Sequence, residues 1–137
     1  MLFNTNKSSL GKKYKEGEWI IRQGEAADCM YVVLEGKVEI VFDDGSGQDF
    51  QIAVLEEDEV FGELALFDDK PRIASARALG TVQILTVDKK GFLQWIGEEP
   101  TFTLRILKKM AGRTRTLISE IVRLRKELAS SKETVEQ

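Results

Sequence analysis

The stretch FGELALFDDKPRIASAR, residues 61–77, combines a Gly-Glu pair, a Pro-Arg pair and several small residues in one short segment. A helix that begins at Glu63 would leave its first backbone N–H groups without intrahelical partners, and such groups attract anions. Arg72 adds a planar guanidinium suited to phosphate, while Glu63 can accept hydrogen bonds from hydroxyl groups. The segment therefore fits a ligand with an anionic end and a hydroxyl-bearing part, such as a sugar phosphate or nucleotide. An ordinary ion pair between Glu63 and Arg72 is the competing interpretation.

Runs of alternating hydrophobic residues on both sides of this stretch predict antiparallel strands. The runs are EWIIRQG (18–24), CMYVVLEGKVEIVF (29–42), FQIAVLEEDEVF (50–61) and IASARALGTVQILTVD (73–88). We expect the second run to form two strands around Gly36 and the fourth to form two strands around Gly80. Short strands separated by glycine-rich turns predict a mainly β sandwich or barrel of the jelly-roll type over about residues 15–87.

The hydrophobic period changes after residue 87. Asp88 is a plausible N-cap for a short helix over about residues 88–97. A long helix is predicted over about residues 101–130, because no proline and only one glycine interrupt that segment. The polar residues 131–137 are expected to be a frayed or disordered tail. A length of 137 residues fits one domain, residues 1–137, with its own core.

The predicted long helix contains a row of mainly apolar residues at alternating steps of three and four. The row, called the seam below, consists of Leu107, Met110, Thr114, Leu117, Ile121, Leu124 and Leu128. This is a heptad pattern with one polar position. A second apolar row widens the stripe and consists of Ile106, Ile118 and Val122. The pattern predicts a parallel homodimer through this helix, and the alternative is that both rows pack within one chain.

The composition restricts the possible chemistry. The chain has no histidine and one cysteine, Cys29, so common histidine-based catalytic and metal sites, internal disulfides and cysteine-ligated iron–sulfur clusters are not expected. Cys29 lies in an apolar run, which favours a small buried residue over a reactive thiol. We expect a non-enzymatic protein without a metal. A jelly-roll enzyme of the cupin type is a remote alternative, since such enzymes usually hold a metal with histidines.

The charge and hydropathy patterns favour a cytoplasmic protein with no membrane segment. No apolar run approaches the roughly 20 residues that a membrane span needs, and the first residues lack the apolar core of a signal peptide. Residues 101–137 contain nine Lys or Arg and four Asp or Glu. Because acidic residues are mixed among the basic ones, we interpret this region as a solvated helix face, with DNA binding by the basic helix as the alternative.

The stretch at 61–77 resembles the phosphate-binding cassette of the cyclic nucleotide-binding domain family, which includes bacterial catabolite activator proteins and the regulatory subunits of cyclic AMP-dependent protein kinase. The matching residues are Phe61, Gly62, Glu63, Leu64, Ala65, Leu66, Pro71, Arg72 and Ala74. Upstream glycines at expected turns, Gly17, Gly24 and Gly36, extend the resemblance, which covers about residues 10–128. It implies an eight-stranded jelly-roll β-sandwich (a double-stranded β-helix) followed by a short helix and a long C-terminal helix.

The resemblance also implies roles for individual residues. The residue matching Glu63 holds a ribose 2′-hydroxyl, the residue matching Arg72 pairs with the cyclic phosphate, and backbone N–H groups at Ala65 and Ala74 reach the phosphate. Ligand binding is expected to move the cassette and the long helix, and this movement is the output signal. These residues would bind a ligand rather than catalyse a reaction.

Two positions depart from the family pattern. Ile73 stands where a Ser or Thr often supplies a hydroxyl, and it cannot hydrogen-bond, which favours cyclic AMP (cAMP) over cyclic GMP (cGMP) as the ligand. Ile73 also leaves open a non-binding domain that serves as a structural dimerisation module with a vestigial pocket. The two hydroxyl residues that touch adenine in catabolite activators align with Leu117 and Ile118. We therefore consider Arg113, Thr114 and Leu117 as candidates for contacting the base.

Partners are expected from the same resemblance. The chain ends at Gln137, which leaves no room for the DNA-binding domain of the catabolite activators. Haem-sensing relatives use a histidine, and this chain has none. The expected partners are a cyclic nucleotide and a second copy of the chain, while the sequence does not identify the effector that receives the signal.

Overall fold

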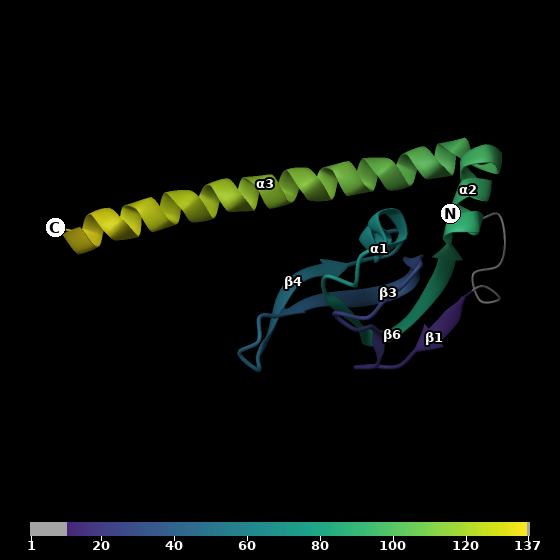
Figure 1. Ribbon diagram of the computed structural model, residues 1–137, viewed down its shortest axis with the longest axis horizontal. Helices are drawn as coiled ribbons and strands as arrows, with labels where there is room; N and C mark the ends of the chain where they lie inside the picture. Colours follow the sequence, from purple (N-terminus) through teal and green to yellow (C-terminus); the bar gives the residue numbers. More distant parts are fainter. Residues whose placement is uncertain (1–10, 137) are drawn as a thin grey trace. The chain divides into compact units, whose positions relative to one another are not determined.

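The computed structural model describes residues 11–136, with side chains described through residue 132. The chain divides into two compact units, Met1–Thr103 and Leu104–Gln137. The first unit contains the β-sheet and two short helices, and the second consists of the part of the long helix α3 (Pro100–Glu136) that follows Thr103 (Figure 1).

An antiparallel sheet of six strands forms the described part of the first unit. The strands are β1 (Lys12–Tyr14), β2 (Trp19–Ile21), β3 (Cys29–Asp43), β4 (Asp49–Leu55), β5 (Val60–Phe61) and β6 (Ser75–Asp88). β3 and β6 pair along most of their length and form the centre of the sheet (Figure 1). β1 and β2 pair with β6, whereas β4 and β5 pair with β3. The expectation of a mainly β fold with flanking helices is confirmed.

β3 and β6 are longer than the sequence pattern suggests. Each was expected to be two strands, but both continue through a glycine of positive φ, Gly36 at 90° and Gly80 at 74°. The β3–β6 register shifts twice here, between Val33 and Glu35 and between Glu35 and Lys37. A side chain at Gly36 would place its Cβ 2.6 Å from the Thr81 carbonyl oxygen, so only glycine fits this bend. Counting the two halves of each long strand separately recovers the eight strands expected.

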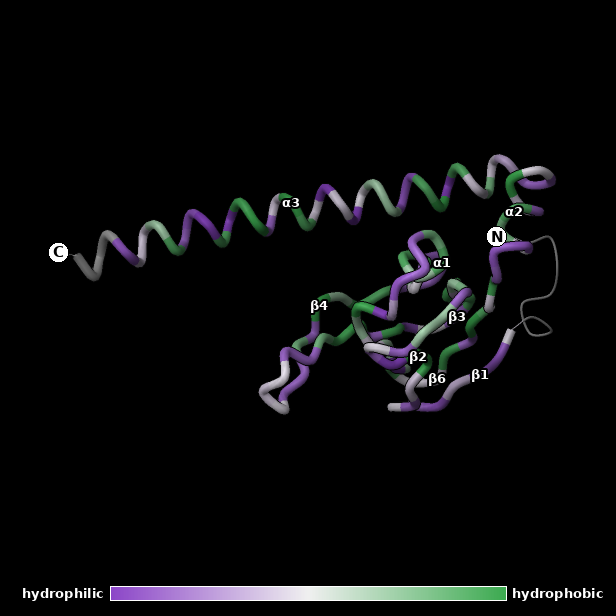
Figure 2. Tube along the Cα trace, viewed as in Figure 1, coloured by the Kyte–Doolittle hydropathy of each residue, from purple (hydrophilic) through white to green (hydrophobic). Residues whose placement is uncertain are grey.

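The inward-facing side chains of the sheet form the core of the first unit. Figure 2 shows hydrophobic and hydrophilic positions along the strands. Buried positions gather in β3 and β6, whereas β4 is exposed at every position except Ala53 and Leu55. One cluster of buried residues comprises Val33, Val38, Leu55, Phe61, Ala76, Ala78, Val82 and Ile84. Phe61 belongs to this cluster, so the first residue of the 61–77 stretch anchors it to the core.

Two short helices flank the sheet. α1 (Glu63–Asp68) follows β5, and α2 (Lys89–Glu98) follows β6. The prediction that Asp88 caps α2 is confirmed, because its side chain accepts a hydrogen bond from the Gly91 backbone N–H at 2.7 Å. Phe67 of α1 meets the buried Phe92 of α2 edge to face, with ring centroids 5.3 Å apart.

α3 begins at Pro100, a residue tolerated in the first turn of a helix, and continues to Glu136. The sequence predicted that the helix ends near residue 130 and that residues 131–137 form a frayed or disordered tail. The helix instead continues through residues 131–136, and residue 137 lies outside the described residues. No glycine or proline follows Gly112, so nothing in the sequence stops the helix. None of the described helices combines the length and the apolar character that a helix needs to cross a bilayer.

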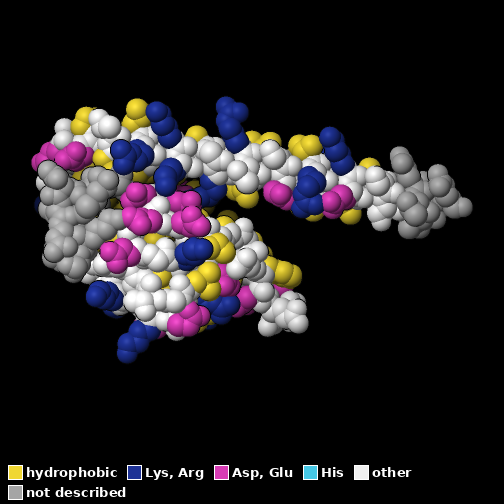
Figure 3. Space-filling model, turned by 180° about the vertical axis from the view of Figure 1, so that it is seen from behind, with side chains coloured by type: hydrophobic (Ala, Val, Ile, Leu, Met, Phe, Trp, Pro, Cys, Tyr) yellow, Lys and Arg dark blue, Asp and Glu magenta, His cyan; other side chains and the backbone are white. Residues whose placement is uncertain are grey.

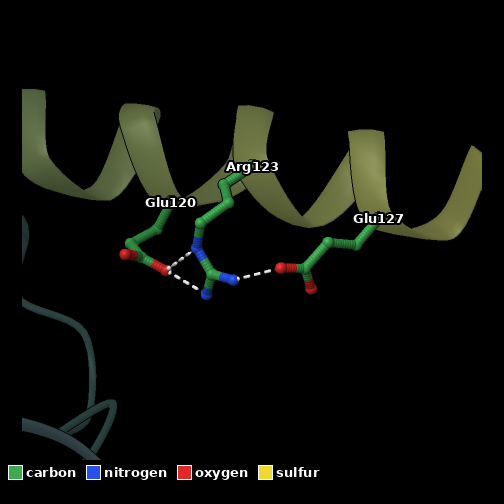
Figure 4. Close-up of polar contacts among 3 residues, drawn as sticks. All are labelled: Glu120, Arg123 and Glu127. Carbon is green, nitrogen blue, oxygen red and sulfur yellow. Dashed lines mark hydrogen bonds and ion pairs between the residues drawn. The ribbon is translucent and has the colours of Figure 1, made fainter. Parts of the chain in front are cut away.

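The surface of α3 carries both charged and apolar side chains. Arg123 donates hydrogen bonds to Glu120 at 2.7 Å and to Glu127 at 2.5 Å, which links three successive turns (Figure 4). Figure 3 shows hydrophobic side chains between basic ones along this helix. The large apolar residues of α3 that are between 47% and 65% exposed are Leu104, Leu107, Leu117, Ile118, Ile121, Val122, Leu124 and Leu128. The predicted seam is therefore largely open in the single chain.

Candidate functional site

The candidate site is the segment of residues 61–77, called the cassette below. Its first residue, Phe61, is the last residue of β5 and pairs with Tyr31 of β3, so the segment begins at the sheet. Gly62 then adopts a positive φ of 75° and acts as the N-cap of α1, which begins at Glu63 as the sequence predicts. Since glycine has no side chain, Gly62 cannot itself cap the first N–H groups of α1 with a side-chain oxygen.

Gly62 lies directly against two other residues of the site. A Cβ at this position would lie 2.6 Å from the Arg72 Nη1 atom and 3.3 Å from the Tyr31 Cδ2 atom. The first distance is too short for a real contact. Glycine is therefore required here both by the positive φ and by the close approach of the Arg72 side chain.

Arg72 is 5% exposed, and its guanidinium is held by backbone oxygens. Its Nη1 donates to the Gly62 carbonyl oxygen at 2.6 Å, and its Nη2 donates to the Cys29 carbonyl oxygen at 2.9 Å. Because both acceptors are uncharged, these two hydrogen bonds satisfy donors without neutralising the positive charge. The guanidinium carbon also lies 5.3 Å from the centre of the Tyr31 ring.

The backbone of Arg72 is fixed by the turn at residues 22–25. The Gly24 N–H donates to the Arg72 carbonyl oxygen at 2.8 Å, and the Arg72 N–H donates to the Glu25 carbonyl oxygen at 2.9 Å. Nearby, the Gln23 N–H donates to the Ser75 hydroxyl at 2.7 Å. The upstream glycine turn that forms part of the family resemblance therefore serves to hold the arginine of the cassette.

The other predicted residues of the cassette differ in exposure. Ala65 and Ala74 are buried and Glu63 is half-buried, whereas Leu64 and Ile73 are 51% and 65% exposed. Ile73 thus does not fill the interior of the site. Its side chain faces solvent, where it can neither donate nor accept a hydrogen bond.

Two residues near Arg72 were missed as site residues in the sequence. Tyr31 stacks on Phe61 with ring centroids 5.2 Å apart, and Cys29 is half-buried rather than buried as expected. The Cys29 sulfur and the Tyr31 hydroxyl lie 3.5 Å apart in a hydrogen bond. Burial, followed by this hydrogen bond, raises the pKa of Tyr31 well above its ordinary value near 10. Only the pairing of β3 with β5 brings Tyr31 to the cassette, so the local sequence gave no signal.

The residues considered for contact with a base lie on α3 in the second unit. Arg113 is half-buried, Leu117 is exposed, and the Thr114 hydroxyl donates to the Met110 carbonyl oxygen at 3.1 Å. That bond to the preceding turn is common for threonine within a helix. The role of these three residues stays a prediction.

Two surface depressions on the first unit lie apart from the key side chains of the cassette. One of about 460 Å³ lies between β6 and α2, and a second of about 280 Å³ includes Leu66 and Asp69 of the cassette. Neither is lined by Glu63 or Arg72. Among the side chains that the structure describes, those of residues 11–132, no group of three His, Cys, Asp or Glu is arranged to hold a metal ion. The candidate site is therefore defined by the arrangement around Arg72.

The antiparallel sheet, the glycine turn before α1 and the buried arginine agree with the fold and the cassette that the sequence resemblance predicts. The family model for the cyclic nucleotide-binding domain matches residues 11–99. This chain belongs to the cyclic nucleotide-binding domain family.

Named relatives are regulators. The chain is 28% identical over 102 residues to the CRP-like cAMP-activated global transcriptional regulator of Mycobacterium tuberculosis, covering 74% of this chain and 46% of the relative. It is 40% identical over 89 residues to the cAMP-dependent protein kinase type II regulatory subunit of Drosophila melanogaster, covering 64% of this chain and 23% of that subunit.

A solved structure agrees with these relationships. The catabolite activator protein of Thermus thermophilus is 30% identical, with a TM-score of 0.71, over 82% of this chain and 53% of that protein. In each of these three comparisons the chain spans less than two thirds of the relative's length, about half in the bacterial proteins.

Proposed function

We propose that this chain is a sensor domain that binds a cyclic nucleotide at the cassette, with cAMP as the preferred ligand. The observation that supports this most directly is Arg72. Its guanidinium is almost fully buried, the two carbonyl oxygens that accept its hydrogen bonds carry no charge, and it lies beside a glycine turn that begins a helix. Such a group is suited to an anionic phosphate.

The family resemblance supplies the roles of the remaining residues. In the proposal, Glu63 accepts a hydrogen bond from the ribose 2′-hydroxyl, and the backbone N–H groups of Ala65 and Ala74 contact the cyclic phosphate. Ala65 and Ala74 have short side chains that allow a ligand to approach the backbone. Phe61, Gly62 and Leu64 complete the segment that frames the ligand. The residues act in binding, and we propose no catalytic step.

The preference for cAMP rests on two points. Ile73 cannot supply the hydroxyl that often stands at this position in the family. The bacterial and kinase relatives are named for activation by cAMP or dependence on it. Arg113, Thr114 and Leu117 are the residues that we propose for contact with the base.

The output in this proposal is movement of α3, in a parallel homodimer formed through the seam. α3 exposes the apolar residues that a coiled-coil partner would cover, among them Leu117, Ile121 and Leu124. In the proposal the two compact units act together as one domain. The proposed function also requires an effector that responds to the movement of α3.

A calorimetric titration of the chain with cAMP and, separately, with cGMP tests the proposal. We expect saturable binding of both, with tighter binding of cAMP. Tighter binding of cGMP would contradict the assigned preference. No heat and no thermal shift with either nucleotide at millimolar concentration would contradict the function.

A second candidate is a structural dimerisation module with a vestigial pocket. The open seam of α3 favours it, since that surface needs a partner whether or not a nucleotide binds. In that case the chain would dimerise and cyclic nucleotides would leave its melting temperature unchanged.

A further inference from the structure

An aromatic pair lies beside the guanidinium of Arg72. Tyr31 of β3 and Phe61 of β5 are cross-strand partners, and their rings stack at 5.2 Å with an angle of 18° between the planes. Phe61 is 2% exposed, so its ring is fixed in the core. The Tyr31 ring is therefore held between the core and the guanidinium, whose carbon lies 5.3 Å from the ring centre.

The Tyr31 ring attracts the buried positive charge of Arg72, which the hydrogen bonds of this residue to carbonyl oxygens do not neutralise. Burying a positive charge costs free energy unless nearby groups attract it. The Gly62 and Cys29 carbonyls hold two edges of the guanidinium but carry no net charge. The negative face of an aromatic ring attracts a cation, and the attraction strengthens where water is excluded. Tyr31 thus offers the guanidinium a favourable surface without using any of its N–H donors.

We infer that Tyr31 is a positioning residue for Arg72 and that its ring sets the affinity for a cyclic phosphate. This inference rests on the proposed function. An arginine side chain loses much rotational freedom when it binds a phosphate. A ring that fixes the guanidinium before the ligand arrives reduces that loss. Tyr31 itself needs no contact with the nucleotide.

The hydroxyl of Tyr31 has a separate environment. It lies 3.5 Å from the Cys29 sulfur, and its half-buried position disfavours the ionised form. The hydroxyl therefore stays neutral and is directed to Cys29. The aromatic face, rather than the hydroxyl, is expected to act on Arg72, and variants can separate the two.

Calorimetry with cAMP compares the wild type with three variants of this residue. Tyr31→Phe keeps the ring and loses the hydroxyl, while Tyr31→Leu and Tyr31→Met remove the ring and fill its space with aliphatic groups. We expect the aliphatic variants to bind about 10-fold more weakly, within the range of a desolvated cation–π contact, and Tyr31→Phe to stay within about 2-fold of wild type. Tyr14→Leu, at the other half-buried tyrosine, is the matched control and should bind like wild type.

Wild-type affinity in a folded aliphatic variant would overturn the inference, and so would an equal loss in Tyr31→Phe. Having two aliphatic variants keeps the test decisive if one of them does not fold. An independent measurement uses the free protein. The Arg72 side-chain Nε–H resonance, assigned by its absence in Arg72→Lys, should shift in the aliphatic variants and keep its wild-type position in Tyr31→Phe.

The NMR measurement separates this inference from the proposed function. If the wild type binds no cyclic nucleotide, the function fails, but a resonance that depends on the ring would still support Tyr31 as the residue that positions Arg72. A resonance that is the same in all variants would overturn the positioning role even if cAMP binds.

Discussion

Arg72 holds a full positive charge in a place that water hardly reaches. Its backbone is tied to Gly24 and Glu25, and its guanidinium is tied to Gly62 and Cys29. A side chain fixed at both ends has already lost most of its conformational entropy in the folded protein. In the proposed function it would therefore bind an anion with a smaller entropic cost than a mobile surface arginine.

The first prediction concerns the charge and the shape of this residue. Arg72→Ala should weaken cAMP binding by about 1.5–3 kcal/mol, the range for hydrogen bonds to charged groups, and Glu63→Ala should have an effect of similar size. Arg72→Lys keeps the charge but lacks the planar fork, so it should also bind more weakly than wild type. Calorimetry measures all three, and equal affinity of Arg72→Ala and wild type would contradict the site.

The second prediction concerns the ionisation of Tyr31. Its pKa is raised in the folded protein, chiefly by burial, so the folded state favours the neutral phenol. The stabilisation that this gives is complete below the unfolded pKa near 10 and is lost as the pH rises above it. In a Tyr14→Phe variant, which leaves Tyr31 as the one tyrosine, we expect tyrosinate absorbance to appear only with alkaline unfolding. Titration of the folded variant near pH 10 would contradict this.

At the scale of elements, α1 depends on the turn that precedes it. The six residues of α1 are too few to be stable as an isolated helix, so its position is set by the Gly62 turn and by the buried Ala65 and Leu66. The same turn faces the Arg72 guanidinium. The start of α1 and the position of the arginine are therefore linked through one glycine.

The third prediction tests this link with Gly62→Ala. The new Cβ would lie 2.6 Å from Arg72 Nη1 in a backbone of positive φ, so the arginine must shift. We expect weaker cAMP binding and a free energy of unfolding lower by at least about 1–2 kcal/mol, which is the cost of the left-handed conformation alone. Urea unfolding and calorimetry measure the two effects.

Gly47→Ala in the β3–β4 turn is the matched control. Gly47 has a φ of 88°, but its Cβ would have no atom within 4 Å. This variant should show the conformational cost without a change in cAMP affinity. If Gly62→Ala also left the affinity unchanged, the contact between the turn and Arg72 would have no part in binding.

Elements with local signals were predicted well from the sequence. The start of α1 at Glu63 and the capping of α2 by Asp88 were both predicted. Each depends only on residues that lie within one helical turn in the sequence. The continuity of β3 through Gly36 was not predicted. A glycine in the sequence is equally compatible with a turn between two strands and with a bend inside one strand, and only the pairing of β3 with β6 distinguishes the two. Tyr31 was missed for the same reason, since its place beside Arg72 depends on strand register.

At the scale of the whole molecule, charge and apolar surface suggest two different ways for copies to associate. Residues 1–100 contain eleven basic and nineteen acidic residues, whereas residues 101–137 contain nine basic and four acidic residues. Opposite charges on the two regions could bring copies together at low ionic strength. The exposed seam of α3 could instead join two helices by burial of apolar surface.

Sedimentation equilibrium at two salt concentrations distinguishes these cases. Charge attraction is screened within about 3 Å at 1 M salt, whereas apolar burial is not weakened by added salt. We expect a dimer at micromolar concentration that persists at 1 M salt. Leu124→Lys, which places a charge in the seam, should yield a monomer, while Ser119→Lys, on the opposite side of the heptad, should remain a dimer. A wild-type chain that is monomeric at both salt concentrations would contradict the dimer, and a dimer lost only at high salt would assign it to charge.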